Sequence, residues 1–197
     1  MANFHPSPLR LARARLREGF RAFAEETRGT VAVESIILLP LVVWMYLAMF
    51  TFFDMLRMRS MTQKATFTVA DAYSRETSKI NDTFVSSSFS LFQQMVRDNS
   101  AGLRVSVLRY DPDTDRYLVS WSQKRGTSGG AALNEAAANA MKDQLPNIAA
   151  GDEFLLVETW NNYQIPFKIG MDDFEMKSLI FMNPRFTSQL KWDDGTA

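Results

Sequence analysis

Residues 27–60 read TRGTVAVESIILLPLVVWMYLAMFTFFDMLRMRS and contain the longest apolar stretch of the chain. Residues 31–53 include one charged side chain, that of Glu34. As an α-helix this stretch would be roughly 34 Å long, which is enough to cross a hydrocarbon core of about 30 Å. It also exceeds the length of the apolar region in an ordinary signal peptide. The sequence therefore predicts one transmembrane helix that stays in the protein.

The charges of the chain predict how this helix is oriented. Lys and Arg total 22, as do Asp and Glu, so the whole chain is neutral. Residues 1–29 carry six arginines and three glutamates, which leaves a net charge of −3 on the remainder. This bias favours a cytoplasmic N-terminus, although Arg57, Arg59 and Lys64 follow the span. A mildly acidic body argues against nucleic acid as a partner, and the absence of cysteine excludes disulfides and thiolate metal sites.

Glu34 is the unusual residue of the span, because carboxylates are costly in lipid and often mark function there. One interpretation is that Glu34 lies close enough to the start of the stretch to reach the headgroups. The other starts from Gly29, five residues earlier: cleavage after it would create a new α-ammonium on Thr30. Glu34, about one helical turn away, could neutralise that charge on its own chain or on a neighbouring subunit. Within packed helices, such a pairing would set the register.

The pattern of Gly, four residues and Glu, opening an apolar helix after a basic leader, resembles the type IV prepilin signal. The sequence GTVAVESIILLPLVV more specifically resembles the TadE/TadF family of pilin-like proteins of the tight-adherence (Tad, or Flp) pilus system. That family typically reads G-x-x-A-V-E-F-x-x-x-x-P-x-L-L. Ser35 replaces the usual phenylalanine, and the residues that match are Gly29, Ala32, Val33, Glu34, Pro40 and Leu41.

The resemblance implies a minor pilin or pseudopilin of a Tad (type IVc-like) pilus, acting in pilus assembly or initiation. A prepilin peptidase would cut between Gly29 and Thr30, Glu34 would pair with the new N-terminus, and Pro40 would lie where transmembrane helices pack. The implied partners are the prepilin peptidase, other pilin or pseudopilin subunits, the inner-membrane assembly platform and membrane lipid. The protein would be a peptidase substrate and not an enzyme. It would span the bacterial inner membrane once with its C-terminal domain in the periplasm, and its entry into an extracellular pilus is left open.

The helical pattern does not stop at the end of the span. Apolar residues recur at steps of three and four through Met58, Met61, Ala65, Val69, Ala72 and Tyr73. This spacing predicts one helix over residues 31–77, and two helices with a break at residues 54–57 are the alternative. A second helix is predicted after a turn at Asn81 and Asp82, ending at Asn99 and Gly102. Its expected buried face consists of Phe84, Ser88, Leu91, Phe92, Met95 and Val96.

Alternating apolar residues predict antiparallel strands in the remainder of the chain. Residues 103–110 and 116–123 are expected to form a hairpin, the first strand being amphipathic and the second presenting Tyr117, Val119 and Trp121 on one side. An alanine-rich helix is expected over residues 131–145, and strands over residues 152–165 and 177–186. The order predicts an α+β fold, in which a long N-terminal transmembrane or spine helix precedes a small periplasmic domain with three or four antiparallel strands. The resemblance implies a pilin-like packing of this sheet on the spine helix.

Three parts of the chain are therefore expected. Residues 1–29 form a cytoplasmic basic leader, residues 30–80 form the transmembrane helix with its amphipathic extension, and residues 81–197 form the α+β head. The leader is either an amphipathic helix on the inner membrane surface or a solvated basic tail. It contains the single histidine of the chain, His5.

The head offers few candidates for chemistry. Asp111, Asp113 and Asp115 alternate as in a calcium loop, but they lack the glycine and distal glutamate of an EF-hand, and a hairpin turn explains them as well. No nucleophile motif or phosphate loop is present, and no cofactor is predicted. The aromatic residues of VETWNNYQIPF are either core or an interface with a partner pilin. Two rival functions remain: an uncleaved bitopic scaffold of a pilus or secretion assembly, and a signal-anchored periplasmic enzyme or metal-binding sensor.

Overall fold

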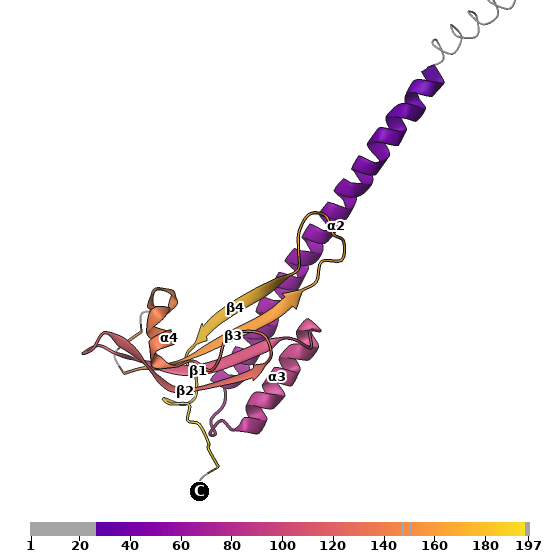
Figure 1. Cartoon of the computed structure of the whole chain (residues 1–197). Coiled ribbons are helices and arrows are strands. Elements are labelled where there is room, and N and C mark those ends of the chain that lie inside the picture. The colour runs from indigo at the N-terminus through magenta and orange to yellow at the C-terminus, as the bar shows by residue number, and fades with distance from the viewer. Residues whose placement is uncertain (1–26, 147, 150, 196–197) are drawn as a thin grey trace, which may run out of the picture. The chain divides into compact units, whose positions relative to one another are not determined.

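The computed structural model describes residues 27–146, 148–149 and 151–195, and it has an α+β fold (Figure 1). The helices are α2 (Thr27–Ser74), α3 (Asp82–Val96) and the short α4 (Glu135–Ala140), which a 3-10 turn, η1 (Lys142–Gln144), follows. The strands are β1 (Gly102–Asp111), β2 (Arg116–Gly126), β3 (Glu153–Tyr163) and β4 (Phe174–Met182). The predicted α+β class, with a long apolar N-terminal helix and an antiparallel sheet of four strands, is confirmed. Residues 1–26 of the predicted leader lie outside the described residues.

Helix α2 is a single helix of 48 residues that includes Pro40 and continues through residues 54–57. The alternative of two helices with a break there is wrong. Residues 31–74 of this helix are long and apolar enough to cross a membrane. By their contacts, the residues up to Phe50 form one unit, and those from Thr51 onward form a second compact unit. The large apolar side chains that face solvent within residues 31–53 are 47–72% exposed.

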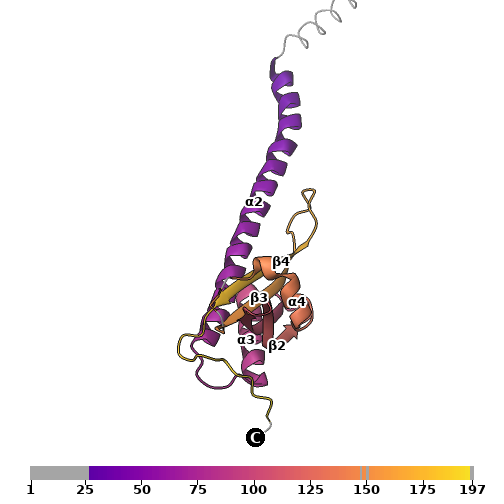
Figure 2. The same cartoon turned by 90° about the vertical axis from the view of Figure 1, so that its left-hand side faces the viewer.

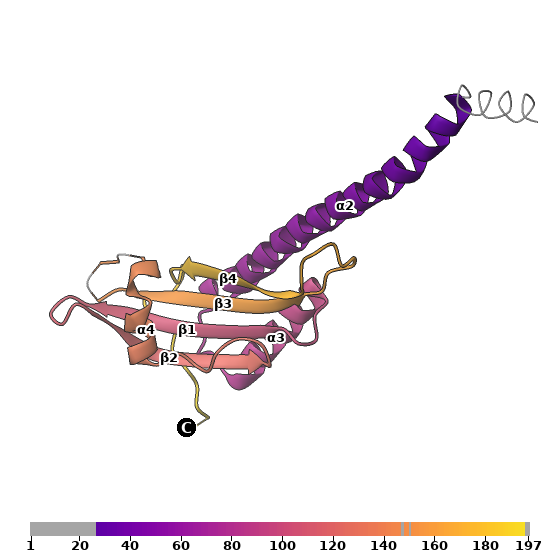
Figure 3. The same ribbon diagram turned by 45° about the horizontal axis from the view of Figure 1, so that its top comes forward.

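The sheet has the strand order β2-β1-β3-β4 and is antiparallel throughout. Figure 3 shows the four strands side by side. Both the β1–β2 and β3–β4 pairs are hairpins, and β1 pairs with β3 so that Gly102 lies opposite Trp160 and Arg109 opposite Glu153. The β1–β2 turn therefore lies at the opposite end of the sheet from Tyr163, the last residue of β3.

Both faces of the sheet are covered. On one face, Val105, Val107, Leu155 and Val157 pack with Val69 of α2 and with α3. On the other face, Leu108, Tyr117, Phe154 and Leu156 pack with Leu133, with Ala138 of α4 and with Leu145. Figure 2 shows α4 on the side of the sheet away from α3. The prediction of an amphipathic first strand is therefore wrong, because Ser106 and Leu108 are as buried as Val105 and Val107.

A β-bulge in the β1–β2 hairpin changes which face each side chain takes. Val107 lies opposite Trp121, but the next residue, Leu108, lies opposite Val119, so Ser120 is the extra residue. One extra residue reverses the in–out alternation of a strand. Trp121 consequently packs on the α2 face, while Tyr117 and Val119 pack on the α4 face. The prediction that these three side chains share one side is wrong for this reason.

The ends of α3 are fixed by local capping. The Asn81 side chain accepts a hydrogen bond from the backbone N–H of Phe84 at 2.9 Å, and Arg97 ends the helix in the left-handed region with φ = 56°. The last residue of the helix, Val96, is thus three residues before Asn99. Its buried residues are Val85, Ser88, Phe92 and Val96, whereas Leu91 of the predicted face is 42% exposed. Helix α4 is also much shorter than predicted.

Candidate functional site

The predicted processing region lies in the N-terminal part of α2. The Gly29–Thr30 bond is in the first turn of the helix, which begins at Thr27. A Cβ atom on Gly29 would meet nothing within 4 Å, so the packing of the described chain does not explain why a glycine is here. Glu34 is exposed and Pro40 lies inside the helix. Among the described residues, Gly29, Glu34 and Pro40 therefore lie along an exposed stretch of α2.

The predicted Asp111–Asp113–Asp115 cluster is a hairpin turn in which the side chains of Asp111 and Asp115 already have partners. The Asp111 carboxylate accepts hydrogen bonds from the Asp113 backbone N–H at 3.1 Å and from the Thr114 hydroxyl at 2.8 Å. Asp115 accepts a hydrogen bond from the Tyr110 hydroxyl at 2.8 Å and forms an ion pair with Lys142 at 2.6 Å. Lys142, followed by Tyr110, lowers the pKa of Asp115. Within the described part of the chain, no group of three His, Cys, Asp or Glu side chains is placed to hold a metal ion.

A row of polar contacts, here called the polar seam, joins α2 to β3. The Thr62 hydroxyl is 3.0 Å from the Asn161 Oδ1 atom, and the Thr66 and Thr159 hydroxyl oxygens are 2.6 Å apart. At the end of the seam, the Tyr163 hydroxyl donates to the Asp54 carboxylate at 2.9 Å. The seam is buried where Thr66 meets Thr159, both at 0% exposure.

The polar seam follows from the geometry of the two elements. Four residues of an α-helix rise about 6.0 Å, and two residues of a strand rise about 6.8 Å, so the two spacings nearly match. Thr62 and Thr66 therefore meet Asn161 and Thr159 in turn, with β3 running in the opposite direction to α2. The residues of the polar seam were not predicted, because only apolar positions were taken as the sign of a buried helix face. Of the predicted apolar stripe, Ala65, Val69 and Tyr73 are fully buried, whereas Met61 and Ala72 are exposed. The available signal was a threonine pair four residues apart, together with polar residues at alternate positions of a strand.

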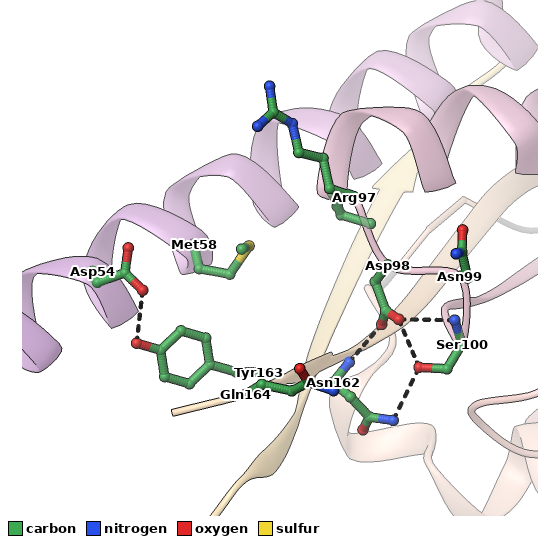
Figure 4. Close-up of a pocket in the computed structure, with 10 residues that line it drawn as sticks. Asp54, Met58, Arg97, Asp98, Asn99, Ser100, Asn162, Tyr163 and Gln164 are labelled. Carbon is green, nitrogen blue, oxygen red and sulfur yellow. Dashed lines mark hydrogen bonds between the residues drawn. The ribbon is translucent and has the colours of Figure 1, made fainter. Parts of the chain in front are cut away.

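A hollow, here called the α2–α3 groove, lies beside the Asp54 end of the polar seam (Figure 4). It has a volume of about 460 Å³. Helix α2 contributes Asp54 and Met58, residues 96–100 come from the end of α3 and the loop that follows, and residues 162–164 come from the end of β3. A neighbouring hollow of about 220 Å³ adds Arg57, Met61 and Met95.

One wall of the α2–α3 groove is tightly hydrogen-bonded. The Asp98 carboxylate accepts hydrogen bonds from the Ser100 backbone N–H and hydroxyl and from the Asn162 backbone N–H, at 2.8, 2.6 and 2.8 Å. This network fixes the loop after α3 to the end of β3. Figure 4 shows the Arg97 side chain standing apart from the network. The wall is thus held together by hydrogen bonds, and among the described residues Arg97 beside it forms no ion pair with an acidic side chain.

The Tyr163–Asp54 hydrogen bond has a testable effect on stability. Tyr163 is 2% exposed, and burial followed by its bond to Asp54 raises the pKa of the hydroxyl to about 12. We expect Tyr163→Phe to lower the free energy of unfolding by about 1.5–3 kcal/mol, the usual value for a hydrogen bond to a charged group. Denaturant unfolding of the purified protein at neutral pH measures this difference.

The pH dependence of that difference provides a control. The folded protein holds the Tyr163 proton more tightly than the unfolded chain, whose tyrosines titrate near pH 10. The stabilisation is therefore complete below pH 10 and is lost as the pH rises toward 12. The difference in stability between wild type and Tyr163→Phe should shrink over this interval. A difference that stayed constant from pH 8 to 12 would contradict the bond.

Two regions thus stand out in the described chain: the exposed apolar part of α2 that carries Glu34, and the α2–α3 groove that begins at Asp54, directly after the apolar residues end. Comparisons of the chain with protein-family models, with curated proteins and with solved structures find no match. The function assigned to the protein therefore rests on its own residues and geometry.

Proposed function

We propose that this protein is a single-pass membrane protein and a TadE/TadF-like minor pilin or pseudopilin, which acts in pilus assembly or initiation. The observation that carries the proposal is the division of α2. Its residues 31–53 expose large apolar side chains around a single carboxylate, that of Glu34. Its later residues, among them Ala65, Val69, Ala70 and Tyr73, are fully buried against α3 and the antiparallel sheet. A helix with one half in lipid or a helix bundle and the other half in a folded head suits a pilin subunit.

The exposed half of the helix requires a partner. An apolar surface of this extent on a soluble protein would be an aggregation hazard, so it must meet lipid or other apolar helices. The basic residues that precede it favour a cytoplasmic N-terminus, and in a bacterial cell the head would then lie in the periplasm. In the membrane the helix is bitopic, and in a filament it would pack laterally against the same segment of other subunits.

Glu34 supports the pilin function more specifically than the span does. Cleavage between Gly29 and Thr30 would leave an ammonium group at the helix start, where the helix dipole already favours negative charge. The Glu34 carboxylate of the same or a neighbouring subunit would neutralise that ammonium. In an apolar environment an uncompensated charge is expensive, so this pairing would set which axial position a subunit takes.

N-terminal sequencing of the protein isolated from membranes tests the proposal. A pilin processed by a prepilin peptidase begins at Thr30, and deletion of the peptidase should restore Met1. An N-terminus at Met1 in cells with an active peptidase would contradict the pilin function and would support the uncleaved bitopic scaffold.

Gly29→Leu is expected to abolish this processing. The side chain has open space around it in the described structure, so any loss of cleavage reflects recognition by the peptidase and not a fold defect. Val31→Leu, two residues away and also exposed, is the matched control and should be cleaved normally. Immunoblotting distinguishes the uncleaved protein from the cleaved protein, because the uncleaved form is larger by the mass of the leader. Normal cleavage of Gly29→Leu would show that the glycine is not recognised.

Glu34→Ala is expected to permit membrane insertion and cleavage but to reduce incorporation of the protein into the pilus or its assembly complex. Because the carboxylate is exposed in the isolated chain, its loss should not affect the fold of the head. Glu34→Asp keeps the charge and should retain part of the activity. Pilus yield in sheared fractions measures the effect, and wild-type yield from Glu34→Ala would contradict the electrostatic role of this residue.

A further inference from the structure

The end of β3 lies next to the point where the apolar part of α2 ends. Along the polar seam, Thr159 meets Thr66 and Asn161 meets Thr62, so β3 runs back toward the N-terminal end of α2. Its last residue, Tyr163, reaches Asp54, which follows Phe53, the last residue of the apolar stretch. The segment that follows Tyr163 therefore begins beside Asp54, the first residue after the apolar stretch, which under the proposed function is where the helix would leave the membrane.

The segment that follows is the β3–β4 loop, residues 164–173, with the sequence QIPFKIGMDD. Figure 2 shows this loop extending beyond the ends of the two strands. Its apolar side chains include Phe167 and Met171, which are 41% and 47% exposed, and Lys168 is exposed between them. An aromatic residue and a lysine among apolar residues are typical of segments at a membrane–water interface.

The base of the β3–β4 loop is held in place. The Ile165 backbone N–H donates to the Asp173 carboxylate at 2.8 Å, which closes the loop. The rings of Tyr163 and Phe174 also pack, with centroids 5.6 Å apart. Because Tyr163 is bonded to Asp54, these contacts fix the start of the loop to α2 at the end of the apolar stretch.

Two arginines lie at the same end of the head. Arg57 is about one helical turn after Phe53, and Arg97 is at the end of α3 beside the α2–α3 groove. Both side chains are exposed, and within the described part of the chain neither forms an ion pair with an acidic side chain. The guanidinium group binds phosphate well, and basic residues next to a span are attracted to anionic headgroups.

We propose that this end of the head is a phospholipid-binding surface. The β3–β4 loop places Phe167 and Met171 in the interfacial layer of the leaflet that faces the head, and Arg57 and Arg97 bind the phosphates of its lipid headgroups. The surface holds the head against the membrane before assembly, and a subunit that leaves the membrane must release it. This inference rests on the membrane-spanning part of the proposed function and not on cleavage.

Single-cysteine labelling of the full chain tests the loop, because the sequence contains no cysteine. Met171→Cys carries an environment-sensitive fluorophore in the loop, and Asp113→Cys carries it in the exposed β1–β2 turn at the other end of the sheet. Leu41→Cys reports on the span. The three proteins are reconstituted into vesicles of phosphatidylethanolamine and phosphatidylglycerol that contain a lipid with a headgroup-level nitroxide quencher.

We expect the Met171 label to be quenched by the nitroxide lipid and protected from iodide in the water, and the Asp113 label to show the reverse. If the Leu41 label lies in lipid but the Met171 label behaves like the Asp113 label, the loop proposal is overturned while the membrane anchor stands. If the Leu41 label is not in lipid, the anchor itself fails, and the lipid-binding surface fails with it.

The arginines are tested by charge removal. Arg57→Gln with Arg97→Asn removes both cations, and asparagine suits the left-handed backbone of position 97. Removal of each arginine should lower the ratio of heads bound to the membrane to unbound heads by about fivefold, as reported by the label at position 171. The matched control removes two exposed arginines near the β1–β2 turn, Arg109 and Arg116, and should leave the ratio unchanged. Equal ratios in both double variants would overturn the role of Arg57 and Arg97.

Discussion

Glu158→Ala is expected to destabilise the head by about 3–5 kcal/mol, because it leaves the largely buried guanidinium of Arg104 without its counter-ion and also removes the partner of the more exposed Lys177. The Glu158 side chain is 0% exposed and that of Arg104 is 11% exposed. Arg104 donates from Nε to the Glu158 carboxylate at 2.6 Å and also contacts it through Nη2. On the other side, the Lys177 ammonium lies 3.0 Å from the second carboxylate oxygen.

The surroundings of this cluster make its loss hard to accommodate. Arg104 also donates from Nη1 to the Ala131 carbonyl at 2.8 Å, and its guanidinium lies 5.2 Å from the centre of the Trp160 ring. Lys177 lies 5.7 Å from the same ring. Neither cation can turn to water without giving up these contacts. The carboxylate therefore stabilises the packing of Trp160 as well as two charges.

Equilibrium denaturation followed by tryptophan fluorescence measures the effect of Glu158→Ala. Glu175→Ala is the matched control, since Glu175 is an exposed carboxylate on the adjacent strand β4 and its loss should change stability by less than about 0.5 kcal/mol. Similar small effects from both variants would mean that Glu158 is not the anchor of the cluster.

Gly129→Ala is expected to cost about 2–5 kcal/mol through two separate effects. Gly129 has φ = 80°, where an L-residue is strained by about 1–2 kcal/mol. A Cβ atom there would also lie 2.3 Å from the Trp160 ring, so the ring or the loop must move, at about 1–3 kcal/mol. The Trp160 ring has little freedom to move, because Arg104 and Lys177 both lie over it.

The next residue provides the control for this prediction. A Cβ atom on Gly130 would meet only the end of the Arg104 side chain, at 3.6 Å, and Gly130 has no positive φ. Gly130→Ala should therefore be close to neutral. Thermal unfolding of the two variants side by side measures the difference, and equal melting temperatures would contradict the packing of the loop on Trp160.

Local patterns were sufficient to predict most of the elements. The apolar run and its helical continuation predicted one unbroken helix, and alternation predicted four strands within a few residues of their bounds. The turn at residues 111–115 was also recognisable, since Asp and Pro favour it. These features depend on residues near one another in the sequence, whose spacing decides between helix, strand and turn.

The sequence by itself determined the long apolar helix, the charge asymmetry around it, the isolated Glu34 and the α+β order of elements. The tertiary structure alone decided the polar seam, the reversal of Trp121 by the bulge, the cluster around Glu158 and the nearness of the β3–β4 loop to Asp54. Each of these features depends on contacts between residues that are distant in the sequence, such as Thr66 with Thr159 and Arg104 with Glu158. A threonine or glutamate is read as solvent-facing until its partner is known. A buried polar group is stable only when it has a hydrogen-bond or ion-pair partner, and here the partners come together only when the chain folds.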